Sequence, residues 1–373
     1  MEHQIDNATG LEFNPHVVAL PPYNAGMNVA AARAISGRDD IARLASNENA
    51  DGCSPAVLAA LSSSALEPWR YADPACTNLR SALAAKLSVD PGYIVVGNGS
   101  EEMIAAVSRA ILIPGASVVT VQPSFGLHEI EPLAQGARVV KVAMTTDLDF
   151  NLDALERAIA DGPRVIFLSS PWNPAGPALT EPGLQRLIAA IKPGTLFVLD
   201  EAYFEFVEDN CPDGLEVLRR SDIPYVVLRT FSKAYGLAGL RVGYAVCSDA
   251  DLARLVGAAK TPFNVNAAAQ LAAVAALDDE QWMRSSVARM RSERERMSGS
   301  LAALGLRIAP SQTNFLFFDC ATDATALAAE LLQSGIVVKA WREPGYETFM
   351  RVTVGTPADN DRLIFALGEA IRR

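Results

Sequence analysis

Short apolar segments alternate with amphipathic helical segments along the middle of the chain, and this alternation constrains the fold more than any other feature. The apolar segments are rich in Val, Ile and Phe, whereas intervening segments such as EEMIAAVSRAIL and LDALERAIA carry apolar residues at i, i+3, i+4 and i+7. Strands that are apolar on both faces and separated by helices are typical of a parallel sheet covered by helices. We therefore predict an α/β unit whose sheet is mainly parallel. Its predicted strands are residues 93–96, 117–121, 138–142, 165–168, 195–199, 225–228 and 241–246.

The pattern changes after about residue 250, where a second and smaller unit is predicted. Residues 266–304 favour helix, and a strand-like NFLFF, a helix at 324–333, short strands around 336–340 and 351–354 and a closing helix follow. A chain of 373 residues has room for about two domains. We expect an N-terminal arm and part of the small domain at 1–45, a large α/β domain at 46–265 and a small α+β domain at 266–373.

Composition and charge exclude several classes of protein. Half of the residues are hydrophobic, so the chain can bury a large core and is not disordered as a whole. The formal net charge of −11 disfavours binding to nucleic acid or to anionic membranes. No apolar run reaches the roughly 18 to 20 residues of a membrane span, and the N-terminus does not resemble a secretory signal. We expect a cytoplasmic protein without nucleic-acid or membrane partners.

Cysteine and histidine are sparse and scattered. The five cysteines form no CxxC pair, and the three histidines lack the spacing of metal ligands, so we predict neither a disulfide framework nor a metal site. The sequence also contains no GxSxG segment, which disfavours a serine hydrolase.

The segment RTFSKAYGLAGLRVGY, residues 229–244, carries the most chemical information. A single lysine after a strand is usually a solvated surface residue. Here Thr230 and Ser232 place hydroxyls just before Lys233, and Arg241 follows eight residues later. Hydroxyls and a guanidinium beside a lysine are suited to hold a phosphate with an amine at its edge.

Three other segments also lie at the ends of predicted strands. Asp200 begins DEAYFEF at the carboxyl end of a strand, where open α/β sheets bind ligands, although an isolated Asp often caps a helix. Asn173–Pro174 in SSPWNPAG would by itself indicate a turn. GNGSEE opens a helix whose free N–H groups could hold a phosphate, although Glu101 and Glu102 could serve only as helix-capping charges.

Together these segments resemble the fold type I aminotransferases that use pyridoxal 5′-phosphate (PLP), and most closely the histidinol-phosphate aminotransferase family. The resemblance extends through nearly the whole chain. The matching segments are PPYNAG (21–26), LASNEN (44–49), RYADP (70–74), GNGSEE (97–102), NPAG (173–176), DEAYFEF (200–206), RTFSKAYGLAGLRVGY (229–244), PFNVN (262–266), PSQTNFLF (310–317) and RVTVGT (351–356).

The resemblance implies a role for each matching residue. Lys233 would bind PLP covalently and then move the substrate proton, Asp200 would pair with the pyridine nitrogen, and Tyr203 would donate to the phenolic oxygen. The other implied cofactor-binding residues hold the phosphate, the phenolic oxygen or the ring: they are Ser100, Glu101 (through its backbone N–H), Phe125, Asn173, Thr230, Ser232, Arg241 and Tyr71. Tyr71 would reach the phosphate of the other subunit, so the resemblance implies a homodimer with shared active sites.

The same resemblance implies that Tyr23, Lys339 and Arg351 bind substrate. The family usually has arginine at the position of Lys339, and a lysine keeps the charge but loses the planar fork. Arg342 lies nearby and could compensate, whereas Asp51 would repel an anionic substrate if it pointed into the site.

The implied reaction is amino transfer between L-histidinol phosphate and 2-oxoglutarate. An aminotransferase for another donor, such as an aromatic amino acid, and an enzyme resembling threonine-phosphate decarboxylases are alternatives that share Lys233. A non-catalytic protein with this fold is disfavoured because Lys233 and Asp200 are both present. A nucleotide-binding dehydrogenase is disfavoured because GNGSEE lacks the GxGxxG spacing.

Overall fold

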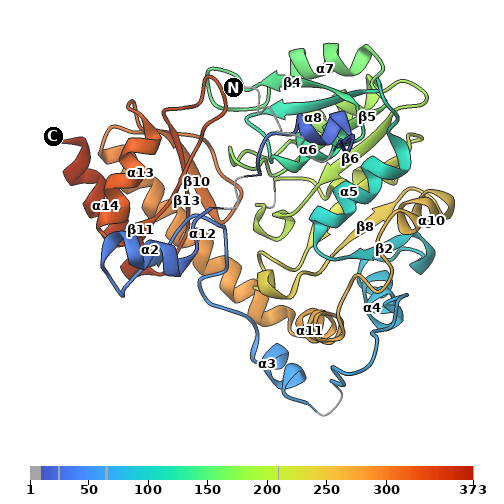
Figure 1. The fold of residues 1–373 in the computed structure, drawn as a ribbon, viewed down its shortest axis with the longest axis horizontal. Helices are drawn as coiled ribbons and strands as arrows, with labels where there is room; N and C mark the ends of the chain where they lie inside the picture. The colour runs from blue at the N-terminus through green and yellow to red at the C-terminus, as the bar shows by residue number, and fades with distance from the viewer. Residues whose placement is uncertain (1–9, 24–25, 64–65, 209, 373) are drawn as a thin grey trace.

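The computed structural model describes residues 10–23, 26–63, 66–208 and 210–372. Figure 1 shows a large sheet with its helices and, beside it, a smaller group of strands and helices near the C-terminus. In the described residues, no helix has the length and the apolar character that a membrane crossing requires.

The large sheet has seven strands in the order β2-β8-β7-β6-β5-β3-β4. Neighbours from β4 through β7 run parallel, and β8 runs antiparallel to both β7 and β2. The predicted mainly parallel sheet is confirmed. Its strands are β2 (Ile94–Gly97), β3 (Ser117–Gln122), β4 (Arg138–Ala143), β5 (Val165–Ser169), β6 (Leu196–Asp200), β7 (Tyr225–Thr230) and β8 (Gly243–Cys247).

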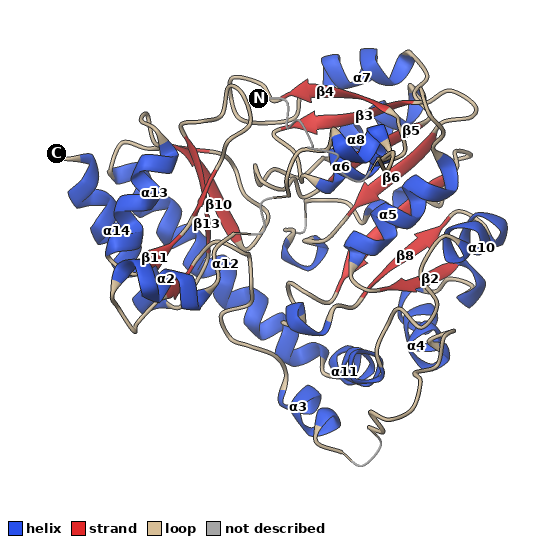
Figure 2. Cartoon of the chain, in the orientation of Figure 1, coloured by secondary structure: helices blue, strands red, loops and turns tan. Residues whose placement is uncertain are grey.

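Alternate residues of the central strands feed two separate cores, one on each face of the sheet. Phe197 and Leu199 of β6 belong to one buried cluster, whereas Leu196 and Val198 of the same strand belong to the other. This is the period of two expected for a strand, and it explains why the central strands are apolar throughout. The sheet is therefore covered on both faces, as Figure 2 shows.

Helices connect and cover these strands. Those within the chain segment of the large sheet are α5 (Ser100–Ile111), α6 (Leu127–Ala134), α7 (Leu152–Ala160), α8 (Glu181–Ala189) and α9 (Gly214–Leu218). Those that precede or follow it are α1 (Pro15–Val18), α2 (Val29–Ser36), α3 (Pro55–Leu61), α4 (Thr77–Leu87), α10 (Ala250–Ala258) and α11 (Ala267–Asp278). Short 3-10 turns occur at η1 (Pro91–Tyr93), η2 (Phe204–Phe206) and η3 (Ala238–Leu240).

One predicted strand begins later than expected. Residues 241–246 were predicted as a strand, but Arg241 has a φ of 59° at the end of η3, and β8 begins only at Gly243. An extended strand cannot include a left-handed residue, so the loop that carries Lys233 continues as far as Arg241.

A second sheet is built from the C-terminal part of the chain, in the order β12-β13-β10-β9. Its strands are β9 (Arg307–Ile308), β10 (Phe315–Asp319), β12 (Lys339–Ala340) and β13 (Phe349–Thr353), and its helices are α12 (Glu280–Ala303), α13 (Ala324–Gln333) and α14 (Pro357–Ile371). The predicted strands around 336–340 are divided between two sheets, because β11 (Ile336–Val337) pairs with the N-terminal β1 (Ala42–Arg43).

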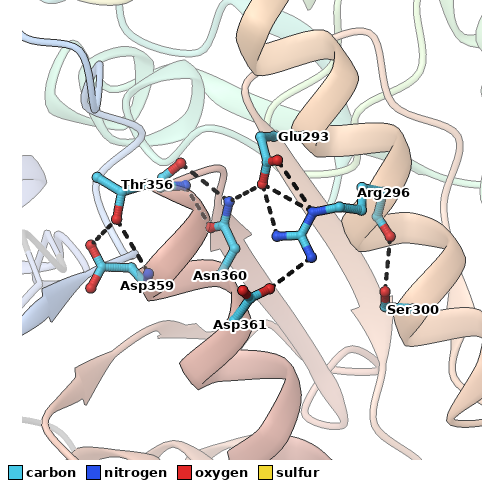
Figure 3. A network of polar contacts seen from close by, with 8 residues as sticks. Glu293, Arg296, Ser300, Thr356, Asp359, Asn360 and Asp361 are labelled. Carbon is cyan, nitrogen blue, oxygen red and sulfur yellow. Dashed lines mark hydrogen bonds and ion pairs between the residues drawn. The ribbon is translucent and has the colours of Figure 1, made fainter.

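Polar contacts fasten α14 to the long helix α12 (Figure 3). The Asn360 side chain, fully buried, accepts a hydrogen bond from the N–H of Gly355 and donates one to Glu293. Arg296 pairs with Glu293 on its own helix and with Asp361 on α14. Buried amides are tolerated only when they are hydrogen-bonded, so Asn360 fixes how the two helices meet.

Candidate active site

A cavity of about 900 Å³ opens at the carboxyl ends of the parallel strands, where sheets of this kind bind ligands. The residues predicted from the sequence line this cavity, with the exception of Tyr71. The cavity-lining predicted residues are Tyr23, Ser100, Glu101, Phe125, Asn173, Asp200, Tyr203, Thr230, Ser232, Lys233, Arg241, Lys339 and Arg351. Segments that are far apart in sequence therefore meet at one place.

Asp200 ends β6 and is held by a histidine that the sequence analysis assigned no role. Oδ2 of Asp200 lies 3.1 Å from Nε2 of His128, whose side chain is fully buried. The centres of the His128 and Phe167 rings lie 5.4 Å apart in a stacked arrangement, and those of His128 and Phe125 lie 5.6 Å apart in a T-shaped one. Nδ1 of His128 has no hydrogen-bond partner among the described residues. With Nδ1 unpartnered, the Nε2–H tautomer is the one that donates to Asp200 and orients its carboxylate. No local pattern indicates this contact, because His128 and Asp200 lie 72 residues apart in the sequence.

Glu201, the residue that directly follows β6, does not line the cavity and instead braces the strand ends. Glu201 forms a buried ion pair with Arg229 of β7 at 2.7 Å, and Arg229 also contacts Asp213 at 2.7 Å. The Arg229 guanidinium lies 3.6 Å from the centre of the Phe204 ring. Buried charges persist only when they are paired and hydrogen-bonded, so this cluster ties the end of β6 to the end of β7.

Lys233 lies in the loop after β7, and the pKa of its ammonium group is lower than that of an ordinary lysine. Burial, reinforced by the positive charges of Arg351 and Arg241, lowers the pKa of Lys233 to about 8. Its Nζ donates a hydrogen bond to the carbonyl of Ser46 at 3.2 Å. At pH 7 about a tenth of this group is therefore the neutral, nucleophilic amine, far more than in an ordinary lysine.

The N-terminus of α5 and the Lys233 loop form a cradle for an anion. No side chain caps α5, whose N-cap is Gly99, so its first N–H groups are available to a ligand. Thr230 and Ser232 hydroxyls lie 3.0 Å apart at the cavity wall. A Cβ at Gly243 would lie 2.5 Å from the backbone nitrogen of Ser100, so only glycine lets β8 approach the helix this closely.

Arg241 reaches the same cradle, with one difference from the sequence-based expectation for Glu101. The prediction gave Glu101 only a backbone contact, but its carboxylate accepts a hydrogen bond from Nη2 of Arg241 at 2.9 Å. The Glu101 carboxylate is itself an anion, so this contact shows that the Arg241 guanidinium can hold an anion beside the N-terminus of α5.

Arg351 is buried and partly satisfied. Nη1 donates to Oδ1 of Asn173 at 2.6 Å, and Nη2 donates to the carbonyl of Ala45 at 2.8 Å. The remaining Nε is buried with no hydrogen-bond partner among the described residues. A buried guanidinium that lines a cavity and keeps an unused donor is suited to receive an anionic ligand.

Tyr203 is positioned by a residue that the sequence analysis left without a role. The Asn47 side-chain amide donates to the Tyr203 hydroxyl oxygen at 2.7 Å, and Thr353 donates to the Asn47 carbonyl oxygen at 3.1 Å. Burial raises the pKa of Tyr203 to about 12, so the phenol is protonated and can donate a hydrogen bond. Asn47 belongs to LASNEN, a segment that matches the family without itself indicating a role for Asn47.

Two residues discussed from the sequence lie outside the cavity. Tyr71 is 86% exposed and packs on Phe263 with 4.7 Å between ring centres. Asp51 does not point into the site, because its carboxylate pairs with Arg289 at 2.7 Å and accepts a hydrogen bond from Ser286 at 2.7 Å. The charge repulsion considered for Asp51 is thereby removed.

Comparison with known proteins identifies the family. The family model described as aminotransferase class I and II matches residues 39–367. The chain belongs to this family. A relative named histidinol-phosphate aminotransferase 3, from Rhizobium meliloti (strain 1021), is 46% identical over 352 residues, covering 94% of this chain and 95% of the relative. The resemblance stated from the sequence is confirmed.

Solved structures agree with this assignment. The crystal structure of a histidinol-phosphate aminotransferase from Sinorhizobium meliloti in complex with PLP has a TM-score of 0.88 and 31% identity, covering 96% of this chain and 97% of that one. An L-threonine-O-3-phosphate decarboxylase from Porphyromonas gingivalis is similar at a TM-score of 0.76 and 25% identity, covering 89% of this chain and 100% of that one. The chain is a PLP-dependent aminotransferase, and its substrates are an amino donor and a 2-oxo acid.

The cavity of this aminotransferase fits PLP. The uncapped end of α5, the hydroxyls of Thr230 and Ser232 and the guanidinium of Arg241 suit a phosphate. Gly243 leaves room for that contact, and Asp200 and Lys233 line the same cavity. Cation, carboxylate and amine are thus the groups that a phosphorylated pyridine aldehyde requires.

The acidity of Lys233 can be tested directly in cofactor-free protein. Because burial and Arg351 lower its pKa, acylation of Lys233 should reach half its maximal rate at about pH 8, as followed by mass spectrometry of the labelled peptide. Arg351→Gln should move this midpoint to higher pH, since a positive charge is removed. The surface substitution Arg284→Gln should leave it unchanged. A midpoint near 10.4, the ordinary lysine value, in the unaltered protein would contradict this description of the site.

Proposed function

We propose that this aminotransferase catalyses reversible amino transfer from L-histidinol phosphate to 2-oxoglutarate, giving imidazole acetol phosphate and L-glutamate. The observation that carries the proposal is a group of cations, Lys339, Arg342 and Arg351, in the same cavity as Lys233. Phosphate and carboxylate are the anions that such groups bind. The name of the 46% identical relative supports the same substrate. The proposal places the enzyme in histidine biosynthesis and in the cytoplasm.

In this mechanism each residue near Lys233 has a distinct task. PLP, when bound, accepts the amino group and stabilises the electron pair released at the substrate Cα. Lys233 holds the cofactor and then, as a free amine, moves the proton at Cα. Asp200, oriented by His128, would pair with the ring nitrogen, and Tyr203 and Asn173 would donate to the phenolic oxygen. The remaining cofactor contacts, from Ser100, Glu101, Phe125, Thr230, Ser232 and Arg241, fix the phosphate and the ring.

The proposed substrate-binding residues are Tyr23, Lys339 and Arg351. Burial, with Arg351 and Arg342 adding to it, lowers the pKa of Lys339 to about 8, so most of this group is still charged at pH 7. An anion placed among these cations would raise that pKa and would itself be held by charge-assisted hydrogen bonds. A ping-pong enzyme must accept both substrates in one pocket, so the phosphate of one and a carboxylate of the other would use this cluster in turn.

Dependence on the phosphate group tests the substrate. Charge-assisted hydrogen bonds contribute roughly 1.5 to 3 kcal/mol each, so kcat/KM for histidinol phosphate should exceed that for histidinol by about a factor of ten or more. Phenylalanine should also be a poor donor. If histidinol or phenylalanine reacts within a factor of about ten of histidinol phosphate, the enzyme has a different donor. Release of carbon dioxide from threonine phosphate would instead favour the decarboxylase-like alternative.

We also propose a homodimer in which Tyr71 reaches the phosphate site of the partner. The support is an exposed pair of aromatic rings in contact: Tyr71 is 86% exposed and Phe263 46%, with 4.7 Å between the ring centres. Exposed aromatic side chains that gather at one place commonly mark a protein interface. Tyr71 also lies outside the cavity of its own chain, which is the arrangement expected if it completes another one.

Mixed dimers test this arrangement. Lys233→Ala lacks the essential amine, and Tyr71→Ala has a weakened phosphate site. When the two variants are unfolded and refolded together, some dimers would hold one active site with both original residues, so activity should exceed that of either variant refolded alone. A fully active monomer at working concentration, or no gain on mixing, would contradict the shared site.

We propose the domain division predicted from the sequence: an arm with part of the small domain at 1–45, a large domain at 46–265 and a small domain at 266–373. The two sheets support it, because the strands of the seven-stranded sheet lie between residues 94 and 247 and those of the four-stranded sheet between 307 and 353. The pairing of β1 with β11 supports the assignment of the N-terminal segment. Residues 1–9 of the arm lie outside the described residues.

A further inference from the structure

One wall of the active-site cavity carries a carboxylate that the proposed mechanism does not use. Glu343 lies in the loop between β12 and β13 and lines the cavity together with Glu129 and Lys141. We propose that Glu343 is the residue that determines specificity for the imidazole ring of the donor, by accepting a hydrogen bond from a ring N–H. This inference rests on the proposed function and adds to it the group that distinguishes the donor from phenyl-bearing analogues.

The two oxygens of Glu343 have different environments. Oε2 accepts hydrogen bonds from the backbone N–H of Ser124 at 3.0 Å and from Nε1 of Trp341 at 2.7 Å. Oε1 is buried without a hydrogen-bond partner among the described residues, and the nearest charge paired with it is Nζ of Lys141 at 3.9 Å. The carboxylate is therefore held in place by one oxygen, while the other keeps an unused acceptor.

The neighbouring charges leave this position negative. Lys141 on β4 donates to both oxygens of Glu129 on α6, at 3.0 and 3.2 Å, so its charge is already matched. Burial raises the pKa of Glu343, and Lys141 and the two hydrogen bonds on Oε2 oppose that rise. The formal charges of Lys141, Glu129 and Glu343 sum to one negative charge, which favours a hydrogen-bond donor or a cation at this position over an anion.

The position of Glu343 is fixed relative to the rest of the site. The Tyr346 hydroxyl donates to the carbonyl of Gln122 at 3.0 Å, which fastens this loop to the end of β3. Ser124, which holds Glu343, directly precedes Phe125, the residue expected to stack on the cofactor ring. Glu343 thus lies beside the place where the donor must bind.

The charges on this segment match the two ends of the proposed donor. Lys339 and Arg342 are cations that suit a phosphate, and the neighbouring Glu343 is an acceptor that suits a ring N–H. An imidazole ring always has at least one N–H, whereas a phenyl ring has none. A phenyl ring against Oε1 would leave a desolvated carboxylate oxygen unpaired, so the same group that favours imidazole also rejects phenyl.

Two unreactive inhibitors measure this discrimination in the PLP-loaded enzyme. The first is 3-(imidazol-4-yl)propyl phosphate, which is histidinol phosphate without its amino group, and the second is 3-phenylpropyl phosphate. Glu343→Gln keeps an acceptor for Ser124 and Trp341 but replaces Oε1 by an amide nitrogen. It should weaken the imidazole inhibitor roughly fivefold or more, because a charged acceptor is lost. Glu343→Leu should weaken it roughly tenfold or more.

The phenyl inhibitor and a second glutamate serve as controls. Neither variant should weaken the phenyl inhibitor, and Glu343→Leu should strengthen it. Glu347→Gln, an exposed change in the same loop, should leave both inhibition constants unchanged. Equal weakening of both inhibitors by the Glu343 variants would overturn the inference while leaving the proposed function intact. Failure of the unaltered enzyme to bind either phosphate would overturn the proposed function, and the inference with it.

Discussion

The parallel hydrogen bonding of β5, β6 and β7 determines where the loops of the active site lie. In this register Ser169 lies opposite Asp200, and Asp200 lies opposite Leu228, so the three strands end at nearly the same level. The loops that follow these strands carry Asn173, Tyr203 and Lys233, and they therefore lie together at that edge of the sheet. A slip of one residue in β6 would exchange Asp200 with Glu201 and turn the wrong carboxylate to the cavity.

Burial then gives these side chains their chemistry. The same desolvation lowers the pKa of Lys233 and raises the pKa of Tyr203, so one group is a better nucleophile and the other a secure hydrogen-bond donor. Arg351 contributes to the acidity of Lys233 while it offers an unused N–H to an anion. Braces outside the cavity, above all the Glu201–Arg229 pair, hold the strand ends on which this arrangement depends.

Much of this could be predicted from the sequence, and the omissions have a common cause. The strands were predictable because residues such as Leu196 to Leu199 are apolar on both faces, and Lys233 and Arg241 because phosphate-binding groups cluster locally in sequence. His128, Asn47 and Glu343 act through contacts across the fold, so no local pattern marks them. Asp51 shows the same limit, because its direction depends on Arg289, more than two hundred residues away. The late start of β8 depends on the left-handed backbone of Arg241, which residue type alone does not indicate.

The attachment of the cofactor to Lys233 can be tested by locating the bound PLP on the chain. The purified enzyme is treated with borohydride, which makes a lysine–PLP linkage permanent, and is then digested and analysed by mass spectrometry. We expect the added mass of the reduced cofactor on the peptide that contains Lys233 and on no other. Cofactor mass on Lys141, Lys260 or Lys339 instead, with an unmodified Lys233, would contradict it.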